Sequence, residues 1–218
     1  MRVRSSIYSL ILSSALIVPS VSAFATTSCL NNPKEQALRS AELQSIVQAD
    51  QKDRIPPIDW SVVGPRDEQR EIRVAEIFAE GCLVSADDYA AAALVFQHGT
   101  VPDHYYQAYI WAKRAFDLGK EDESSLIADA VDRYLISIGQ KQLFAAQTFR
   151  NGPRGCHCLG EVEQTFPDKL RIEYTGKSLQ ERIDDLREEN KSNPLCKNIL
   201  YCPTHLRPPT RGQFPGIW

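Results

Sequence analysis

The sequence predicts an all-α protein, a helical bundle or a set of stacked helix pairs, with a disulfide-stapled, proline-rich C-terminal extension. Between residues 33 and 138, apolar residues recur at steps of three and four, the period of a helix with one buried face. Single glycines follow several of these segments, as they follow helices. After residue 149 the chain is instead rich in turn residues, prolines and cysteines. We therefore expect a helical domain over residues 24–150 and a cysteine-rich extension over residues 151–218.

Five helices are expected in the first domain, over residues 33–53, 66–81, 88–99, 103–119 and 121–138. The third is apolar nearly all round, which predicts a place in the middle of the bundle. Before the second, the pairs Pro56-Pro57 and Gly64-Pro65 favour a rigid, non-helical connection. Stacked helical repeats are an alternative, because two helices have the small-residue composition of helical hairpins, but no fixed repeat period supports it.

The extension is predicted to be less regular. Residues 151–160 are expected to form a loop, residues 170–174 a short strand, and residues 178–191 a charged helix. Ser178 and Glu181 have the spacing of a capping box at the start of that helix. Residues 193–218 contain prolines and two cysteines, so we expect an extended tail held by disulfides.

Length and charge limit the partners. A chain of 218 residues fits one domain with appendages, and a hydrophobic fraction of 43% is ordinary for a folded protein. The 25 basic and 28 acidic residues give a net charge of -3. Since nucleic-acid binding requires a basic surface, we expect no nucleic-acid partner, but an unidentified protein or small molecule.

The first 23 residues have the order of a secretory signal peptide. Arg2 and Arg4 precede an apolar run, and small residues around Ala23 and Ala25 offer two cleavage sites. A membrane anchor is the alternative, but the run is shorter than the roughly 20 residues that cross a bilayer. A lipoprotein site at Cys29 is a further alternative, although Thr26 stands where an apolar residue is usual. We expect a periplasmic or secreted protein with no membrane span after cleavage.

The six cysteines fit an oxidising compartment. An even number in an exported chain indicates disulfides first, here three, although sequence alone allows 15 pairings. We expect one bond on the helical body and two that join the close pair near residue 157 to the last two cysteines. Zinc is an alternative, because His157 and His205 lie among these cysteines, but the spacing matches no standard zinc site. The expected bonds are Cys29 with Cys82, and Cys156 and Cys158 with Cys196 and Cys202.

Few residues are candidates for chemistry. No nucleophile motif and no phosphate-binding glycine loop is present, so we expect no cofactor and no metal site. A catalytic histidine would have to be His98 or His104, of which His104 has the position of an ordinary first-turn residue. His98 ends the most apolar helix, where a histidine commonly bonds the last carbonyls. Asp132 and Arg133 lie off the apolar stripe of their helix, which taken alone predicts a flank pair of little energetic weight.

Three short motifs follow one another in the chain: Gln97-His98, Asp132-Arg133 and Gly139-x-x-Gln142-x-x-x-x-Gln147. Their order resembles a bacterial family of helical domains of unknown function. That family carries a Gln-His pair, an Asp-Arg pair and a closing Gly-x-x-Gln-x-x-Gly-Thr-Gln stretch. The resemblance covers residues 35–149 and implies a fold and a shared polar cluster, but no activity. Ala145 and Ala146 depart from it, because they stand where Gly-Thr is usual. The matching residues are Gln97-His98, Asp132-Arg133, Gly139, Gln142 and Gln147, with Asp50-Gln51-x-x-Arg54 resembling the opening segment.

Two hypotheses follow from these residues. In the first, Gln97, His98, Asp132, Arg133, Gln142 and Gln147 form a buried polar network in an exported binding or interaction module. In the second, the same cluster lines a cleft of a hydrolase-like enzyme. There His98 acts as base, Asp132 orients it and Arg133 holds an anionic group. The absence of a nucleophile motif favours the first.

Overall fold

The protein is mostly helical, which confirms the predicted class. A computed structural model describes residues 28–151, 155–202 and 217, so the predicted signal peptide lies outside the described residues. The helices are α1 (Pro33–Asp53), α2 (Trp60–Ala79), α3 (Ala86–Gln97), α4 (Pro102–Asp117), α5 (Ser124–Ser137), α6 (Asp168–Thr175) and α7 (Leu179–Glu189). Short 3-10 turns are η1 (Glu121–Glu123) and η2 (Pro194–Cys196), and the strands are β1 (Thr148–Asn151) and β2 (Cys156–Leu159).

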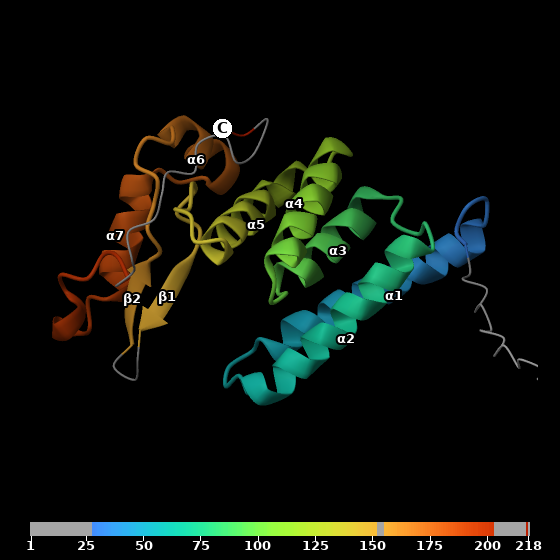
Figure 1. Ribbon diagram of the computed structural model, residues 1–218, viewed down its shortest axis with the longest axis horizontal. Coiled ribbons are helices and arrows are strands. Elements are labelled where there is room, and N and C mark those ends of the chain that lie inside the picture. The colour runs from blue at the N-terminus through green and yellow to red at the C-terminus, as the bar shows by residue number, and fades with distance from the viewer. Residues whose placement is uncertain (1–27, 152–154, 203–216, 218) are drawn as a thin grey trace, which may run out of the picture.

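The helices stack side by side along the molecule (Figure 1). α1 and α2 form an antiparallel pair at one end, α3, α4 and α5 follow, and α6, α7 and the β1–β2 hairpin occupy the other end. α3 packs against α1, α2, α4 and α5, so its alanine-rich faces are covered on several sides, as its composition predicts. The fully buried Ala92 and Ala93 allow the neighbouring helices to approach closely. Within the described residues, no helix is both long and apolar enough to cross a membrane.

α2 begins six residues earlier than the sequence predicts. The expected start was Arg66, with Gly64-Pro65 as a break, but the helix starts at Trp60 and contains Pro65. Asp59 caps it, since its carboxylate accepts a hydrogen bond from the N–H of Ser61 at 3.0 Å. Pro65 lacks the N–H that would bond one turn back, but this cap and the burial of Val63 hold the first turns in helical form.

Two predictions for the extension are wrong. The strand expected at residues 170–174 is helix α6, in which Arg171 is buried and donates to the carbonyls of Leu143, Phe166 and Glu163. A single long side chain that satisfies three carbonyls favours the helix over the local strand preference. Of the residues expected to form a loop at 151–160, Asn151 ends β1 and Cys156–Leu159 form β2, where Cys158 pairs with Phe149.

Further expectations for the extension hold. Ser178 and Glu181 form the predicted capping box at the start of α7. The tail lies partly outside the described residues, but Cys196 and Cys202 are held by disulfides. β1 crosses residue 150, the expected domain boundary, so the hairpin joins the helical part to the extension. A small second core lies there, formed by Ala145, Leu159, Val162, Leu179 and Leu186.

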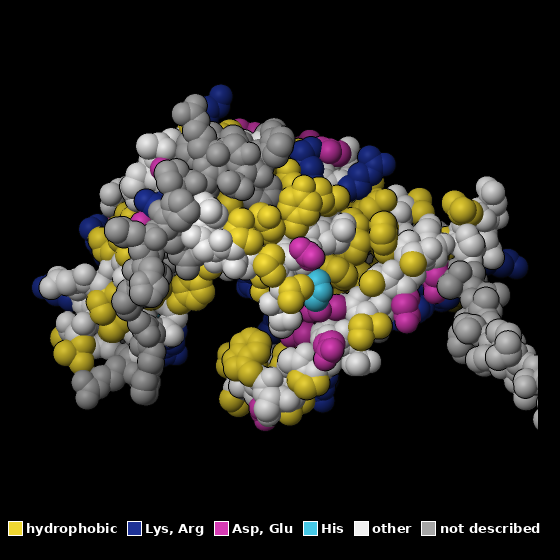
Figure 2. Space-filling model, in the orientation of Figure 1, with side chains coloured by type: hydrophobic (Ala, Val, Ile, Leu, Met, Phe, Trp, Pro, Cys, Tyr) yellow, Lys and Arg dark blue, Asp and Glu magenta, His cyan; other side chains and the backbone are white. Residues whose placement is uncertain are grey.

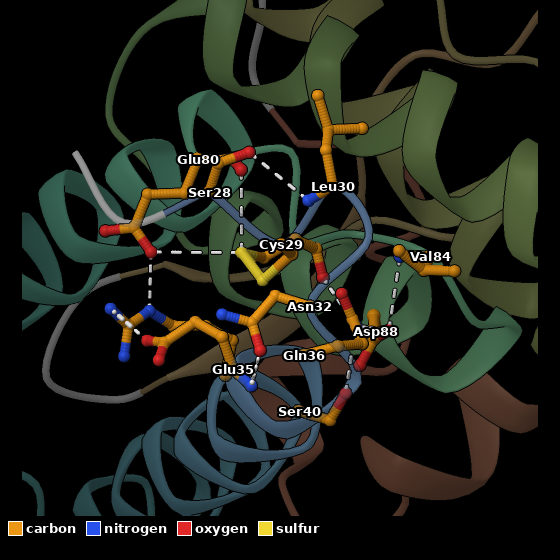
Figure 3. Close-up of a disulfide and its surroundings, with 12 residues drawn as sticks. Ser28, Cys29, Leu30, Asn32, Glu35, Gln36, Ser40, Glu80, Val84 and Asp88 are labelled. Atoms are coloured by element: carbon orange, nitrogen blue, oxygen red, sulfur yellow. Dashed lines mark hydrogen bonds and ion pairs between the residues drawn. A yellow bond between two sulfur atoms is a disulfide. The ribbon is translucent and has the colours of Figure 1, made fainter.

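The three disulfides join the expected cysteines: Cys29 pairs with Cys82, and the close pair is joined to the last two cysteines. The order that the sequence left open is Cys156 with Cys196 and Cys158 with Cys202. The sulfurs considered as zinc ligands are therefore bonded to one another. Figure 3 shows the first disulfide where the chain enters α1. Beside it, the side-chain amide of Gln36 donates to the carbonyl of Cys82 at 2.9 Å and to Asp88 at 3.0 Å. The start of α1 is thus fixed to the start of α3 by covalent and polar contacts together.

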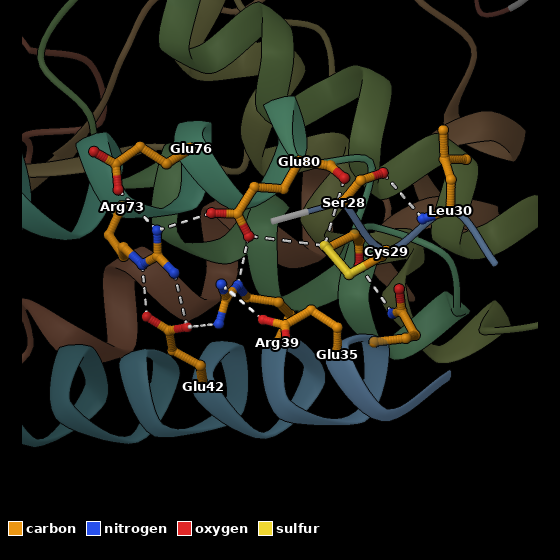
Figure 4. A network of polar contacts seen from close by, with 11 residues as sticks. Ser28, Cys29, Leu30, Glu35, Arg39, Glu42, Arg73, Glu76 and Glu80 are labelled. Atoms are coloured by element: carbon orange, nitrogen blue, oxygen red, sulfur yellow. Dashed lines mark hydrogen bonds and ion pairs between the residues drawn. A yellow bond between two sulfur atoms is a disulfide. The ribbon is translucent and has the colours of Figure 1, made fainter. Parts of the chain in front are cut away.

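A charged network joins α1 to α2 (Figure 4). Arg73 donates to both oxygens of Glu42, at 2.6 and 3.0 Å, and Arg39 bonds Glu80. The hydrogen bond from Arg73 holds the pKa of Glu42 below its ordinary range. α1 buries only Leu43 and Asp50. The bidentate Arg73–Glu42 pair and the single Arg39–Glu80 bond therefore add to the small apolar contact between the two helices.

Candidate functional site

Asp132 on α5 is completely buried, so the prediction of a flank pair is wrong for this residue. Gly139, at φ +80, turns the chain back along α5. The returning backbone donates N–H groups to the Asp132 carboxylate from Leu143 at 2.7 Å, Phe144 at 3.1 Å and Ala146 at 2.9 Å. Burial raises the pKa of Asp132 to about 7, and these N–H groups oppose the rise. Helical periodicity does not predict the burial of Asp132, because the segment that covers it is a loop and not a helix.

The side chain of Gln142, at the start of the same loop, bonds the residue at its end. It is fully buried, and its side-chain amide donates to the carbonyls of Gln147 and Gly160 at 3.1 and 2.9 Å. Its side-chain oxygen accepts the N–H of Gln147 at 2.9 Å. The polar atoms of this buried side chain are therefore all hydrogen-bonded, as is usual for buried amides. Asp132 and Gln142 together fix the shape of residues 142–147.

Arg133 brings the ends of three segments together. It donates from Nη1 to the carbonyl of Gln97 at 2.7 Å and from Nε to the side-chain oxygen of Gln147 at 3.1 Å. Gln147 in turn donates to Asp129 at 3.1 Å. Burial lowers the pKa of Arg133, while Asp129 and Tyr105 oppose that change. Nη2 of Arg133 has no hydrogen-bond partner in the part of the chain that is described.

A pocket of about 440 Å³ lies beside this guanidinium. The hydroxyl of Tyr105, which forms one wall, donates to the carbonyl of Gly99 at 2.6 Å. The lining combines polar groups with aromatic and aliphatic surface, a common composition for ligand pockets. The lining residues are Tyr105, Arg133, Ile136, Ser137, Gln147, Thr148 and Phe149.

His98 pairs with Asp50, not with Asp132. As the residue that ends α3, it places Nδ1 3.1 Å from both carboxylate oxygens of Asp50, which is fully buried on α1. Arg54 bonds the same carboxylate at 2.9 Å. Burial alone would raise the pKa of Asp50, but His98 and Arg54 outweigh it and hold the pKa below its ordinary value. The proposed role of Asp132 as the group that orients His98 is therefore wrong, because its oxygens bond the 143–146 loop.

The side chain of Gln97 is also buried beside this pair. Its side-chain oxygen has no hydrogen-bond partner among the described residues. The six predicted residues thus fall into two connected groups. Asp132, Gln142, Gln147 and Arg133 belong to α5 and its loop, and His98 belongs to a contact with α1. The backbone of Gln97, bonded by Arg133, connects them.

Glu71 and His104 form a second acid–base pair that the sequence did not reveal. Nδ1 of His104 lies 3.0 Å from Oε2 of Glu71; Glu71 is buried and His104 is partly buried. Burial raises the pKa of Glu71 to about 7, helped by Asp67 and Glu68, and burial lowers the pKa of His104. Below pH 7 the carboxyl of Glu71 is therefore mostly neutral, and it lies against an imidazole whose Nδ1 makes no hydrogen bond within the described residues. His104 is therefore more than an ordinary first-turn residue.

Close packing at Gly99 makes this pair possible. A Cβ atom there would lie 2.4 Å from the Cβ of His104, so only glycine allows the approach. On the Glu71 side, Asp67 accepts from Arg54 at 2.9 Å and from Arg70 at 2.7 Å. The motif signal that could have identified this region is the Asp50-x-x-x-Arg54 spacing, whose two side chains both lie in it.

The remaining histidines lie elsewhere. His157 contacts Glu189 at 3.2 Å near the surface, and its backbone is bonded by the side chain of Asn190. His205 lies outside the described residues. Across residues 28–151 and 155–202, no group of three or more histidine, cysteine or carboxylate side chains is arranged to hold a metal ion.

Comparison with known proteins gives no further identification. No protein-family model, no curated protein and no solved structure matches this chain. The resemblance to a helical family, based on the motif order, therefore stays a prediction, and the chemistry of the site must be argued from its own geometry.

Proposed function

We propose that this protein is an exported binding module that holds an anionic ligand in the pocket beside Arg133. The proposal depends on how the guanidinium of Arg133 is hydrogen-bonded. Two of its nitrogens are fixed by Gln97 and Gln147, and Nη2 has no partner among the described residues. A preoriented guanidinium binds carboxylates and phosphates with little loss of side-chain entropy.

The buried network supports this role indirectly. Asp132 and Gln142 are fully bonded within the protein and are not available to a ligand. Their effect is to hold residues 142–147 in one conformation, which places Gln147 against Arg133. A binding site on a rigid support requires less ordering when the ligand arrives.

Export is the second part of the proposal. Three disulfides are typical of an oxidising compartment, and the order of residues in the first 23 positions is that of a signal peptide. Mass spectrometry of the native protein tests it: we expect a mature chain that begins at residue 24 or 26. A protein recovered from its source with residues 1–23 attached contradicts export by cleavage.

Ligand binding is tested by thermal shift and calorimetry of the mature protein against carboxylates and phosphate esters. We expect at least one class to raise the unfolding temperature, and Arg133→Met to remove the effect. Arg133→Lys keeps the charge but loses the planar fork, so it should bind more weakly than the native protein. Arg187→Met, at an exposed ion pair, is the matched control and should bind as the native protein does. Equal binding by Arg133→Met contradicts the proposal.

An acid–base enzyme is the second candidate, and the His98–Asp50 contact favours it. A buried carboxylate at Nδ1 holds a histidine in the tautomer whose Nε2 can accept a proton. Nε2 has no partner among the described residues, and the ring is 13% exposed. In this candidate His98 is the base, Asp50 orients it and Arg133 holds an anionic group. Asp132 has no catalytic role.

Chromogenic ester and phosphate panels test the enzyme. Hydrolysis that is lost in His98→Gln and strongly reduced in Asp50→Asn supports it, with His157→Gln as the control. If no panel member is hydrolysed while anions still bind through Arg133, the enzyme candidate is wrong and the binding function remains.

A further inference from the structure

Within the described residues, the outer edge of β1 has no partner strand. The hydrogen bonds of β2 show which backbone N–H and C=O groups of β1 face away from the hairpin. The N–H and C=O of Leu159 bond Leu200 and Cys202, and those of His157 bond the side chain of Asn190. These two residues of β2 therefore point their backbone groups outward, away from β1.

In an antiparallel pair, residues opposite each other share this orientation. Thr148 faces Leu159 and Arg150 faces His157. The N–H and C=O groups of Thr148 and Arg150 must then point away from β2, on the other side of the hairpin. None of these four groups has a partner in the part of the chain that is described. β1 thus presents two donors and two acceptors at the spacing of a strand.

This edge runs into the pocket beside Arg133. Thr148 and Phe149 line the pocket, and Gln147, which bonds Arg133, directly precedes the strand. Figure 1 shows β1 on the side of the hairpin nearer to α5, while β2 lies toward α7. The space-filling view shows a broad recess between the hairpin end and the α1–α2 end, open to solvent (Figure 2). A chain segment therefore has room to lie along β1.

We propose that the ligand of this pocket is an extended peptide that adds a strand to β1 and ends in a free carboxylate at Arg133. The inference rests on the proposed binding function and names its ligand class. Because Arg133 lies at the start of β1, the carboxyl end of the peptide must lie there, so the peptide runs antiparallel to β1. Backbone bonds to Thr148 and Arg150 supply pairing that is independent of peptide sequence.

The pocket also gives an expected preference for the last residue. Ile136 and Phe149 are apolar walls beside the guanidinium. A terminal residue with an aliphatic or aromatic side chain buries that side chain against them while its carboxylate meets Nη2 of Arg133. Peptides with a charged last residue should bind more weakly.

The experiment uses the disulfide-bonded mature protein and fluorescence anisotropy with labelled pentapeptides. Each peptide that ends in Leu, Phe or Val is compared with the same peptide amidated at its carboxyl end. We expect amidation to weaken binding by about tenfold or more, since a charge-assisted bond is lost. Arg133→Lys should reduce the preference for the free carboxylate, and Arg187→Met should leave it unchanged.

Methylation of single peptide nitrogens tests the strand pairing. Only alternate N–H groups of the peptide face β1. Methylation of the nitrogens that face β1, at every second position, should therefore abolish binding. Methylation of the nitrogens at the positions between them should change binding little, so each set of peptides is the control for the other. This measurement does not depend on any protein variant, so a variant that fails to fold leaves the test intact.

The outcomes separate this inference from the proposed function. If small carboxylates bind through Arg133 and no peptide does, the peptide inference is wrong and the binding module stands. Equal affinity of free and amidated peptides, or equal effects of methylation at both sets of positions, also overturns it. If neither anions nor peptides bind, both proposals fail.

Discussion

The carboxylate of Asp132 accepts the backbone N–H of Leu143 at 2.7 Å, although 11 residues separate them in the chain. Two more N–H groups of the same loop bond this carboxylate. A side chain on α5 therefore acts as the internal partner of a loop that would otherwise bury unbonded N–H groups. The position of Gln147, and through it that of Arg133, depends on this contact.

Replacement of Asp132 should be strongly destabilising. Asp132→Ala leaves three buried N–H groups without acceptors, and we expect a loss of about 3 kcal/mol in the free energy of unfolding. Asp132→Asn keeps the shape but loses one acceptor, so its loss should be smaller. Urea unfolding followed by circular dichroism measures both, with the exposed Asp122→Asn as the control. A loss below that of the control would contradict the role of Asp132.

Replacement of Ala145 should stabilise the protein. Ala145 has φ +59, in the left-handed region where alanine is strained and glycine is not. It also stands where the resembled family has glycine. The loss of one buried methyl group and the greater freedom of glycine in the unfolded chain oppose the relief of strain, so we expect Ala145→Gly to raise the free energy of unfolding by only about 0.5 kcal/mol. Ala146→Gly is the matched control and should be destabilising. The opposite ranking in thermal unfolding would show that residue 145 is not strained.

The Glu71–His104 pair should make stability depend on pH. Because the pKa of Glu71 is raised to about 7 in the folded protein, folding favours its protonated form. Its contribution is then complete below the unfolded pKa of about 4.5 and is lost as pH rises through 7. Asp67, Glu68 and His104 face it, and the lowered pKa of His104 adds an opposite loss at low pH.

Glu71→Gln isolates the contribution of this carboxyl. The amide resembles the protonated acid, so we expect the variant to be more stable than the native protein at pH 8 and to differ little from it at pH 5. Urea unfolding at both values measures the difference. A variant that is less stable at pH 8 than at pH 5, to the same degree as the native protein, would assign the effect to other groups such as Asp129, whose pKa is also raised, to about 6.

The disulfides give a direct chemical prediction. Titration of the mature protein with a thiol reagent, under denaturing and non-reducing conditions, should find no free thiol. Removal of the first bond by a double Cys29→Ala and Cys82→Ala change should cost about 2–4 kcal/mol, since it releases a loop with a sequence separation of 53. Six reactive thiols would instead indicate a reducing compartment.

The sequence by itself predicted those helix ends that are marked by residues within one turn of the end. Ser178 and Glu181 predict the start of α7 because both halves of the capping box lie within one turn. The glycines at 119 and 139 likewise mark helix ends, because their backbone needs a positive φ. Each of these predictions depends on residues that are neighbours in the chain.

Only the tertiary structure decided how the polar side chains of the candidate site pair. Asp132 is buried because a later loop folds onto it, and His98 meets Asp50 because α1 crosses the end of α3. α6 is a helix because Arg171 reaches three carbonyls, one of them 28 residues earlier in the chain. Such contacts depend on how separate elements pack, which helical periodicity does not encode. For this reason the sequence named most polar residues of the site but paired His98 with the wrong carboxylate.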